Sequence, residues 1–306
     1  MDEFELIRRF FDRRVTTPGV VVGIGDDGAV LHPEPGRDQI QVIDTLVEGV
    51  HFPADLPAAD VGYRVVAVNL SDIAAMGGSP RWMTLALTLP RTDERWLTEF
   101  ATGLFEAAAE FDVALVGGDT TSGDAVVATV QMTGEVEAGQ AILRRGARIG
   151  DTIFTTGTPG DAAAGLELFG RGERDNVLVR RFLRPSARIA TGRRLIGRAS
   201  AAIDVSDGLV GDLTKLLEAS GVAGELAIER LPLSDALRAR FEKADSVRFA
   251  LTGGDDYELC FTAAPAAVDD IPGITAIGKV VSGQGLKCLH DGDIVDYGDS
   301  GYRHFQ

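Results

Sequence analysis

Residues 61–90, VGYRVVAVNLSDIAAMGGSPRWMTLALTLP, contain a predicted buried helix followed directly by a predicted strand. The first part is apolar nearly all round, which is typical of a helix enclosed by other elements, and Asp60 is placed to cap its start. Gly77 and Gly78 end the helix. From residue 83 to residue 89, methionine or leucine occupies every second position, which is the period of a strand. This order indicates a fold in which helices pack on a sheet.

Further strands and helices are predicted on both sides of this segment. Around residues 137–148 the apolar periodicity lapses, and charged residues and glycines gather there instead. A second series of strand, turn and helix begins after that stretch. We therefore predict an α/β (α+β) fold with two α/β domains, residues 1–138 and 139–306.

The composition of the chain excludes several classes of function. It has 306 residues, of which 46 are acidic and 30 basic, so its formal net charge is −16. This balance argues against nucleic-acid binding, and an anionic ligand would need cations between itself and the protein. The two cysteines make neither a disulfide framework nor a zinc set. The acidic N-terminus lacks the order of a signal peptide, and no apolar run is long enough to span a bilayer, so we expect a cytoplasmic protein that binds no membrane.

The sequence GIGDDG at residues 23–28 matches the dinucleotide fingerprint G-x-G-x-x-G letter by letter. That fingerprint works because uncharged backbone amides at a helix N-terminus meet a pyrophosphate. Here two aspartates would face the pyrophosphate, and Pro33 follows too soon for a helix. We therefore reject a dinucleotide site, and a tight turn with solvated aspartates is the simplest alternative.

Aspartates recur at the ends of predicted strands. Asp44 closes a strand over residues 40–43, Asp119 follows one over residues 113–116, and residues 204–207, DVSD, follow a third. Open α/β sheets expose their ligand crevices at strand ends, so these carboxylates can converge on one place. Converging carboxylates repel one another unless cations keep them ionised. Mg²⁺ is the natural cation, because it takes oxygen ligands and is commonly shared between protein carboxylates and a substrate phosphate.

Asp72 is the most informative of the aspartates, because it lies on the apolar helix of residues 61–76. We expect its carboxylate to be buried, and a buried carboxylate must have a partner. Arg64 could form a salt bridge only from two turns earlier in the helix. Metal ligation is therefore favoured over a structural ion pair.

Other catalytic signals are weak. Arg144, Arg145 and Arg148 could neutralise phosphates, although a solvated linker is the commoner explanation of such a cluster. The chain has no Walker A loop, no kinase glycine-rich loop paired with H-R-D, and no G-x-S-x-G elbow. His51 is the one histidine beside a motif, and a packed structural imidazole explains it equally well.

Six motifs occur in a fixed order along nearly the whole chain. They are Gly23–Asp27, Asp44–Phe52, Ala67–Gly77, Gly117–Thr121, Asp204–Leu209 and Gly254–Leu259. Together they resemble the thiamine-monophosphate kinase family of the aminoimidazole ribonucleotide synthetase-like superfamily. Other members of the superfamily share the aspartates, but not VNLSDIAAM followed by GGDTT.

This resemblance implies two α/β domains, of which the first binds metal and ATP and pairs its sheet with that of a second chain in a homodimer. It also implies several Mg²⁺ ions, with ATP as co-substrate and thiamine monophosphate as acceptor. The implied metal ligands are Asp27, Asp44, Asp72, Asp119, Asp204 and Asp207. The implied ATP contacts are Gly118, Asp119, Arg144 and Ser206, and the implied substrate contacts are His51, Asp255 and Tyr302.

By the same resemblance, ATP phosphorylates thiamine monophosphate to thiamine diphosphate by direct in-line transfer. An ionised phosphate nucleophile needs no general base, so no catalytic side chain is proposed beyond the metal ligands. Two positions depart from the family pattern. Val42 and Ile43 replace hydroxyl residues, which leaves only backbone oxygens there as metal ligands, and Asp255 replaces a glutamate that is one methylene longer.

Two other functions remain open from the sequence. One is another ATP-dependent synthetase of the same superfamily, which would phosphorylate an amide or carboxylate oxygen. The other is a non-enzymatic divalent-metal binding protein, whose aspartates would serve stability alone.

Overall fold

The contacts within the chain group it into two units. Unit 1 comprises Met1–Ile73 and Gly78–Gly139, and unit 2 comprises Ala74–Gly77 and Gln140–Gln306. The computed structural model describes residues 3–13 and 15–295.

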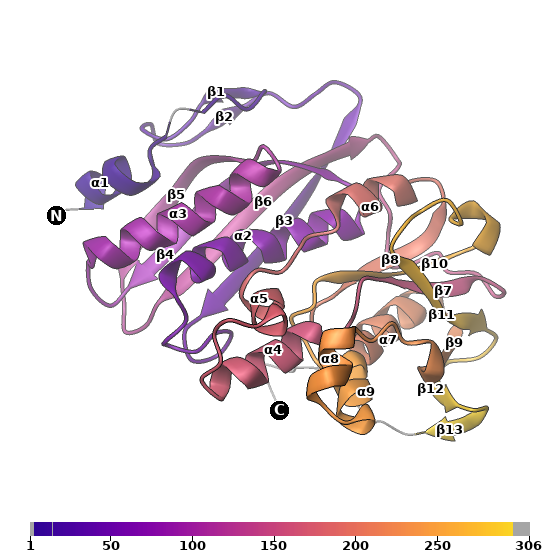
Figure 1. Ribbon diagram of the computed structural model, residues 1–306. Helices are drawn as coiled ribbons and strands as arrows, with labels where there is room; N and C mark the ends of the chain where they lie inside the picture. The colour runs from indigo at the N-terminus through magenta and orange to yellow at the C-terminus, as the bar shows by residue number, and fades with distance from the viewer. Residues whose placement is uncertain (1–2, 14, 296–306) are drawn as a thin grey trace. The chain divides into compact units, whose positions relative to one another are not determined.

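Unit 1 is built on a four-stranded sheet with strand order β3-β6-β4-β5. The central strands β4 and β6 are antiparallel, β6 is antiparallel to β3, and β4 is parallel to β5. Helices α2 and α3 lie side by side over one face of the sheet (Figure 1). The bounds are β3 Arg37–Val47, α2 Ala58–Ala75, β4 Ser79–Leu89, α3 Glu94–Glu110, β5 Ala114–Ser122 and β6 Val127–Glu137.

Helices α2 and α3 touch through their backbones. A Cβ atom on Gly62 would lie 2.0 Å from the carbonyl oxygen of Phe100, and one on Gly103 would lie 1.7 Å from the carbonyl oxygen of Ala59. Only glycine fits such an approach, so these two residues set how closely the helices pack. Asp93 caps α3 by accepting hydrogen bonds from the backbone amides of Arg95 and Trp96.

A small hairpin, β1 (Val20–Val22) with β2 (Val30–Leu31), precedes the sheet of unit 1. Val20 and Leu31 pack against a cluster that contains Trp82, and the Trp82 indole donates a hydrogen bond of 3.2 Å to the carbonyl oxygen of Pro18. The GIGDDG sequence forms the loop of this hairpin and no helix follows it, which agrees with the rejection of a dinucleotide site. Before the hairpin lie α1 (Glu3–Leu6) and the π-helical turn η1 (Ile7–Phe11).

Unit 2 contains a seven-stranded sheet with strand order β13-β12-β9-β11-β7-β10-β8. The strands are β7 Thr152–Thr156, β8 Ala199–Val205, β9 Ala223–Ala227, β10 Glu258–Ala263, β11 Ile274–Val281, β12 Gly285–His290 and β13 Asp293–Val295. The helices are α4 Asp161–Gly170, α5 Val177–Leu183, α6 Ile189–Leu195, α7 Leu209–Ser220, α8 Asp235–Arg240 and α9 Lys243–Thr252, with the 3₁₀ turns η2 Ile228–Arg230 and η3 Pro265–Ala267.

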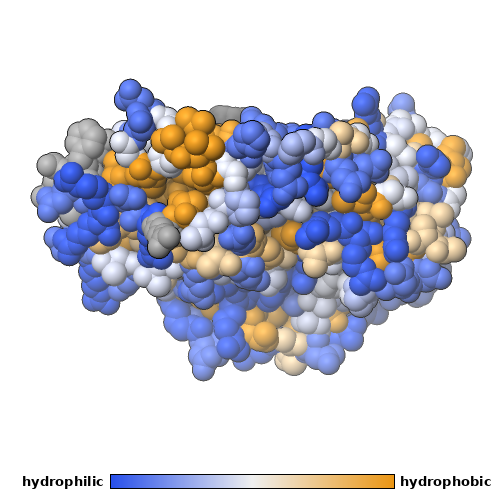
Figure 2. Space-filling model, turned by 90° about the horizontal axis from the view of Figure 1, so that it is seen from above, coloured by the Kyte–Doolittle hydropathy of each residue, from blue (hydrophilic) through white to orange (hydrophobic). Residues whose placement is uncertain are grey.

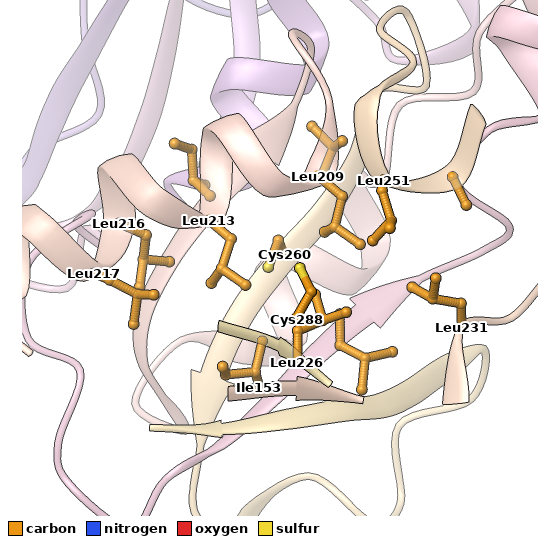
Figure 3. Close-up of a cluster of buried hydrophobic side chains, with 14 of the residues drawn as sticks. Ile153, Leu209, Leu213, Leu216, Leu217, Leu226, Leu231, Leu251, Cys260 and Cys288 are labelled. Atoms are coloured by element: carbon orange, nitrogen blue, oxygen red, sulfur yellow. The ribbon is translucent and has the colours of Figure 1, made fainter. Parts of the chain in front are cut away.

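The core of unit 2 lies between α7 and the sheet. Figure 3 shows leucines of α7 directed at residues of the sheet, among them Leu226 and the two cysteines, Cys260 and Cys288. Both cysteines are buried, and neither forms a disulfide. Burial raises the pKa of the Cys260 thiol, so it remains a protonated, apolar packing group.

The face of the molecule seen in Figure 2 is largely polar. Figure 2 shows hydrophilic side chains over much of the face in view, with smaller hydrophobic groups between them. Among the residues that the structure describes, no helix is both long and apolar enough to cross a membrane.

Candidate functional site

A pocket of about 600 Å³ lies in unit 1, between the hairpin loop and β5. Residues 23–29 form one wall and residues 115–120 the other. The remaining lining residues are Ile7, Arg8, Phe11 and Asp12 of the N-terminal segment, and Leu85 of β4. Three predicted site residues, Asp27, Gly118 and Asp119, thus lie around one cavity although their motifs are some ninety residues apart in the sequence.

The two carboxylates of this pocket reach solvent. Asp27 and Asp119 are both exposed, which leaves their oxygens accessible to a cation or to the metal-bound phosphates of a nucleotide. The Asp27 amide donates a hydrogen bond of 2.9 Å to Asp26 Oδ1, a contact that fixes the loop backbone. Oxygen ligands alone, mostly carboxylate, are the donors that Mg²⁺ prefers.

Gly118 is required by the packing of β5 on β4. A Cβ atom at this position would lie 2.0 Å from the carbonyl oxygen of Leu85. We expect Gly118→Ala to force the two strands apart and to lower the free energy of unfolding by about 2 kcal/mol. Chemical denaturation measures this loss. Gly117→Ala is the matched control, because its Cβ would meet only Thr84 Cγ2, at 3.8 Å, and equal losses for both variants would contradict the argument.

The structure corrects the prediction that Asp44 and Asp119 stand at strand ends. Both lie inside longer strands, Asp44 opposite Val130 of β6 and Asp119 opposite Ala86 of β4. The strands β3 and β5 form the two edges of the sheet, so these aspartates do not meet at a common strand end. Along β3, Asp44 alternates in phase with buried Leu46, which places it on the covered face of the sheet, and it does not line the pocket.

The prediction that Asp72 is buried is also wrong, because its side chain is partly exposed. Asp72 lies in the last turn of α2, and Met76, the residue that follows the helix, is partly exposed as well, so the burial of the helix does not extend round this end. Asn69, one turn earlier, is fully buried and donates a hydrogen bond of 3.0 Å to the carbonyl oxygen of Val65.

His51 is held in the turn after β3. Its Nδ1 atom accepts a hydrogen bond of 3.0 Å from the Val47 amide, and its own amide donates one of 2.9 Å to the Val47 carbonyl oxygen. An accepting Nδ1 leaves the proton of the neutral imidazole on Nε2. These contacts fix the orientation of the ring, which does not line the pocket.

In unit 2 the motif of residues 204–209 lies beside the motif of residues 254–259. The amide of Asp255 donates a hydrogen bond of 2.9 Å to the carbonyl oxygen of Ser206, and the amide of Tyr257 donates one of 2.8 Å to that of Val205. Asp204 is buried within β8, opposite Leu259 of β10. The structure thus brings Asp204, Ser206, Asp207 and Asp255 into one region of unit 2.

Two residues that the sequence analysis missed hold this region together. Asp212, buried in the first turn of α7, accepts hydrogen bonds of 2.9 Å from the amides of Ser206 and Asp207. Lys215 lies 2.6 Å from Asp207 Oδ2 and 2.9 Å from Asp212 Oδ1. An acidic residue in the first turn, with a lysine three residues later, was the available signal.

Burial and mutual contacts shift the pKa values of Asp212 and Lys215. Burial raises the pKa of Asp212, and its hydrogen bonds with Lys215 oppose that shift. Burial alone would lower the pKa of Lys215, but the hydrogen bonds to Asp207 and Asp212 outweigh it, and the pKa is raised. Lys215 therefore remains a cation beside Asp207.

The remaining predicted contact residues are Arg144 and Tyr302. Arg144 is exposed, and its carbonyl oxygen accepts a hydrogen bond of 3.2 Å from Ser220 Oγ. Tyr302 lies outside the described residues. Within residues 3–13 and 15–295, no three histidine, cysteine, aspartate or glutamate side chains are close enough together to hold a metal ion.

Comparison with known proteins agrees with these motifs. Residues 25–136 match the family described as AIR synthase related protein, N-terminal domain. The thiamine-monophosphate kinase of Salmonella typhimurium is 44% identical to this chain, over 99% of this chain and 98% of its own length. The crystal structure of thiamine-monophosphate kinase from Stenotrophomonas maltophilia superposes with a TM-score of 0.88 at 42% identity, covering 96% of this chain and 98% of the other.

A second solved structure, AaThiL complexed with AMPPCP and TMP, superposes with a TM-score of 0.82 at 34% identity, covering 99% of this chain and 96% of the other. These matches confirm the predicted mixed α/β fold of the AIR synthase type and the predicted family. The chain belongs to the thiamine-monophosphate kinase family.

Proposed function

We propose that this protein is a phosphotransferase that uses ATP to convert thiamine monophosphate to thiamine diphosphate. The observation that carries the proposal is the likeness to AaThiL, which binds an ATP analogue and thiamine monophosphate together. The six motifs that predict this activity are distributed along the same length of chain that the relatives match.

The metal ions of the proposed reaction are Mg²⁺. The chemistry of the side chains fits this cation, since the pocket of unit 1 presents the exposed carboxylates of Asp27 and Asp119 and no sulfur ligand. When bound, Mg²⁺ would neutralise the phosphates of ATP and the charge that develops during transfer. The proposed ligands are Asp27, Asp44, Asp72, Asp119, Asp204 and Asp207.

The protein's own groups position the reactants. Gly118 and Asp119 face the pocket of unit 1, while Asp212 holds the amides of Ser206 and Asp207 in unit 2. The proposed ATP contacts are Gly118, Asp119, Arg144 and Ser206, and the proposed substrate contacts are His51, Asp255 and Tyr302. Because the attacking oxygen belongs to an ionised phosphate, no side chain has to remove a proton from it.

We also propose a cytoplasmic homodimer in which the N-terminal domain, residues 1–138, pairs with its counterpart. The face of the unit 1 sheet opposite the helices presents Ile43, whose side chain is 65% exposed, beside Gln41 and Thr45 of the same strand. An exposed isoleucine on a sheet face suits burial against a second copy. Sedimentation velocity of the wild-type protein and of Ile43→Lys tests this, and a monomeric wild-type protein would rule the dimer out.

The acceptor specificity gives a direct test of the proposed function. We expect thiamine diphosphate and ADP to form with thiamine monophosphate, and turnover with free thiamine to be at least about 100-fold lower, because an alcohol needs a base to activate it. Chromatographic separation of the products measures both reactions. Equal ADP release from the two acceptors would contradict the mechanism, and no thiamine diphosphate from either would overturn the function.

A further inference from the structure

The loop that connects α9 to β10 in unit 2, residues 253–257, has an unusual backbone. Asp255 has φ 69° and Tyr257 has φ 52°, both in the left-handed region that residues other than glycine rarely adopt. A backbone of this kind persists only where surrounding contacts enforce it, and such residues cluster at functional sites. The contacts that enforce it here come from two directions.

The first set of contacts is made by Tyr257 itself. Its side chain is buried, with 8% of its surface exposed, and its hydroxyl group donates a hydrogen bond of 3.1 Å to Asp255 Oδ1. Its amide donates to the Val205 carbonyl oxygen at the end of β8. A rigid ring anchored at one end thus orients the carboxylate two residues before it.

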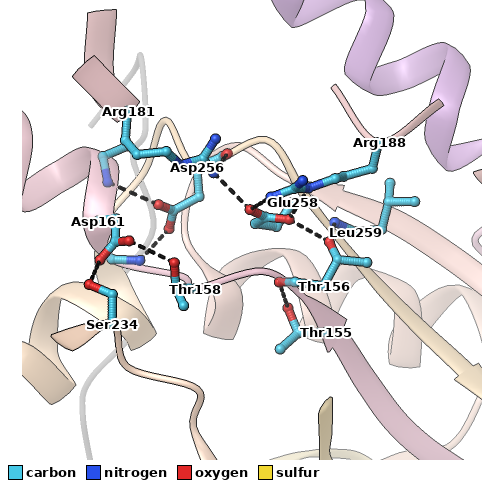
Figure 4. Close-up of polar contacts among 12 residues, drawn as sticks. Thr155, Thr156, Thr158, Asp161, Arg181, Arg188, Ser234, Asp256, Glu258 and Leu259 are labelled. Atoms are coloured by element: carbon cyan, nitrogen blue, oxygen red, sulfur yellow. Dashed lines mark hydrogen bonds and ion pairs between the residues drawn. The ribbon is translucent and has the colours of Figure 1, made fainter. Parts of the chain in front are cut away.

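The second set of contacts comes from helices α4 and α5 (Figure 4). Arg181 of α5 donates hydrogen bonds to the carbonyl oxygen of Asp256, at 3.2 Å, and to Glu258 Oε1, at 2.7 Å. The fully buried carboxylate of Asp256 accepts hydrogen bonds from the amides of Gly160 and Ala162 at the start of α4, at 2.6 and 3.2 Å. These contacts hold the residue between the two left-handed positions on both its backbone and its side chain.

A second arginine provides a comparison within the same cluster. Arg188 also pairs with Glu258, donating from Nε at 2.6 Å and from a terminal nitrogen. Both arginines thus share the buried glutamate, but only Arg181 is also hydrogen-bonded to the loop backbone within the part of the chain that the structure describes.

We propose that Tyr257 and Arg181 are positioning residues for Asp255: the Tyr257 hydroxyl orients the Asp255 carboxylate, and Arg181 holds the loop backbone that presents it to thiamine monophosphate. This inference rests on the proposed function, which places Asp255 at the substrate. The hydrogen bond also offers a reason for aspartate at position 255, where the family pattern has glutamate: the shorter side chain of Asp255 is within reach of the Tyr257 hydroxyl group.

The first test removes a single oxygen atom. We expect Tyr257→Phe to raise the KM for thiamine monophosphate by roughly 3- to 10-fold, the effect of one hydrogen bond to a charged group, and to leave the KM for ATP within about twofold. Tyr63→Phe is the matched control, because Tyr63 donates a comparable hydrogen bond of 3.2 Å to Glu110 in unit 1. Its KM values should stay at those of the wild type.

The second test separates positioning from stability. Arg181→Met and Arg188→Met each remove one partner of Glu258, so both should lower the melting temperature. Only Arg181→Met should raise the KM for thiamine monophosphate, by roughly 10-fold, and Arg181→Lys should recover part of this, because lysine retains a donor for the Asp256 carbonyl oxygen.

The possible outcomes distinguish this inference from the function on which it rests. If the wild-type protein forms no thiamine diphosphate, the proposed function fails before any variant is compared. If the wild type is active but Tyr257→Phe leaves the KM for thiamine monophosphate unchanged, the positioning role is wrong. Wild-type KM values for both Arg181→Met and Arg188→Met would show that the arginines contribute only to stability, and an equal rise in both would refute a positioning role specific to Arg181.

Discussion

Asp119→Asn is expected to lower turnover roughly 100-fold or more at standard Mg²⁺ concentrations, because one anionic ligand is lost from a site that must bind cations between phosphates. Asp119 is exposed and lines the pocket of unit 1 together with Asp27. An exposed side chain contributes little to folding, so the free energy of unfolding should change by no more than about 0.5 kcal/mol. Turnover and chemical denaturation, measured on the same preparation, separate the two effects.

Asp124→Asn is the matched control for this experiment. Asp124 is also an exposed aspartate of unit 1, in the turn between β5 and β6, but it does not line the pocket. Its turnover should stay within about twofold of the wild type. Near wild-type turnover of Asp119→Asn at saturating Mg²⁺ would rule out a metal-binding role for Asp119.

Glu258→Ala is expected to produce the largest loss of stability. The carboxylate of Glu258 is fully buried and accepts hydrogen bonds from Arg181, Arg188 and Thr156. Removing it leaves two guanidinium groups beside each other without their counter-charge, which should lower the free energy of unfolding by about 3 kcal/mol. Urea denaturation followed by circular dichroism measures this loss.

Glu229→Ala controls for the loss of a glutamate as such, because Glu229 lies exposed in η2 of the same unit. It should shift the unfolding free energy by no more than about 0.5 kcal/mol. Tryptophan fluorescence follows the unfolding of unit 1 separately, since both tryptophans, Trp82 and Trp96, belong to that unit, whereas Glu258 belongs to unit 2. If Glu258→Ala unfolds at the wild-type urea concentration, the buried ion pairs contribute no net stability.

The elements of unit 1 could be predicted from the sequence where a pattern is local and periodic. The alternation in β4 and the apolar run of α2 are patterns of this kind, and both elements occur where they were expected. The end of β5 could not be predicted, because GGDTTS has few residues that favour strands and its conformation is imposed by pairing with β4. That pairing is why Asp119 lies within a strand.

Of the candidate site, only the residues within the sequence motifs could be predicted. Residue type and order identified Asp27, Gly118 and Asp119, which the structure brings to one pocket. The supporting contacts could not be found in this way, because Arg181 and Glu258 are 77 residues apart and become partners only once the sheet has formed. The left-handed backbone at Tyr257 is also enforced by distant contacts, since tyrosine has no preference of its own for it.

The backbone contact between α2 and α3 gives unit 1 an internal reporter for isotope exchange. Where Gly62 and Gly103 bring the helices together there is no space for water, so the amides at this crossing exchange with deuterium only when the helices separate. Their exchange free energy therefore measures the opening of the unit that contains the pocket. A ligand bound in that pocket would raise the exchange free energy by RT ln(1 + [L]/Kd), so the crossing acts as a label-free sensor of what the pocket binds.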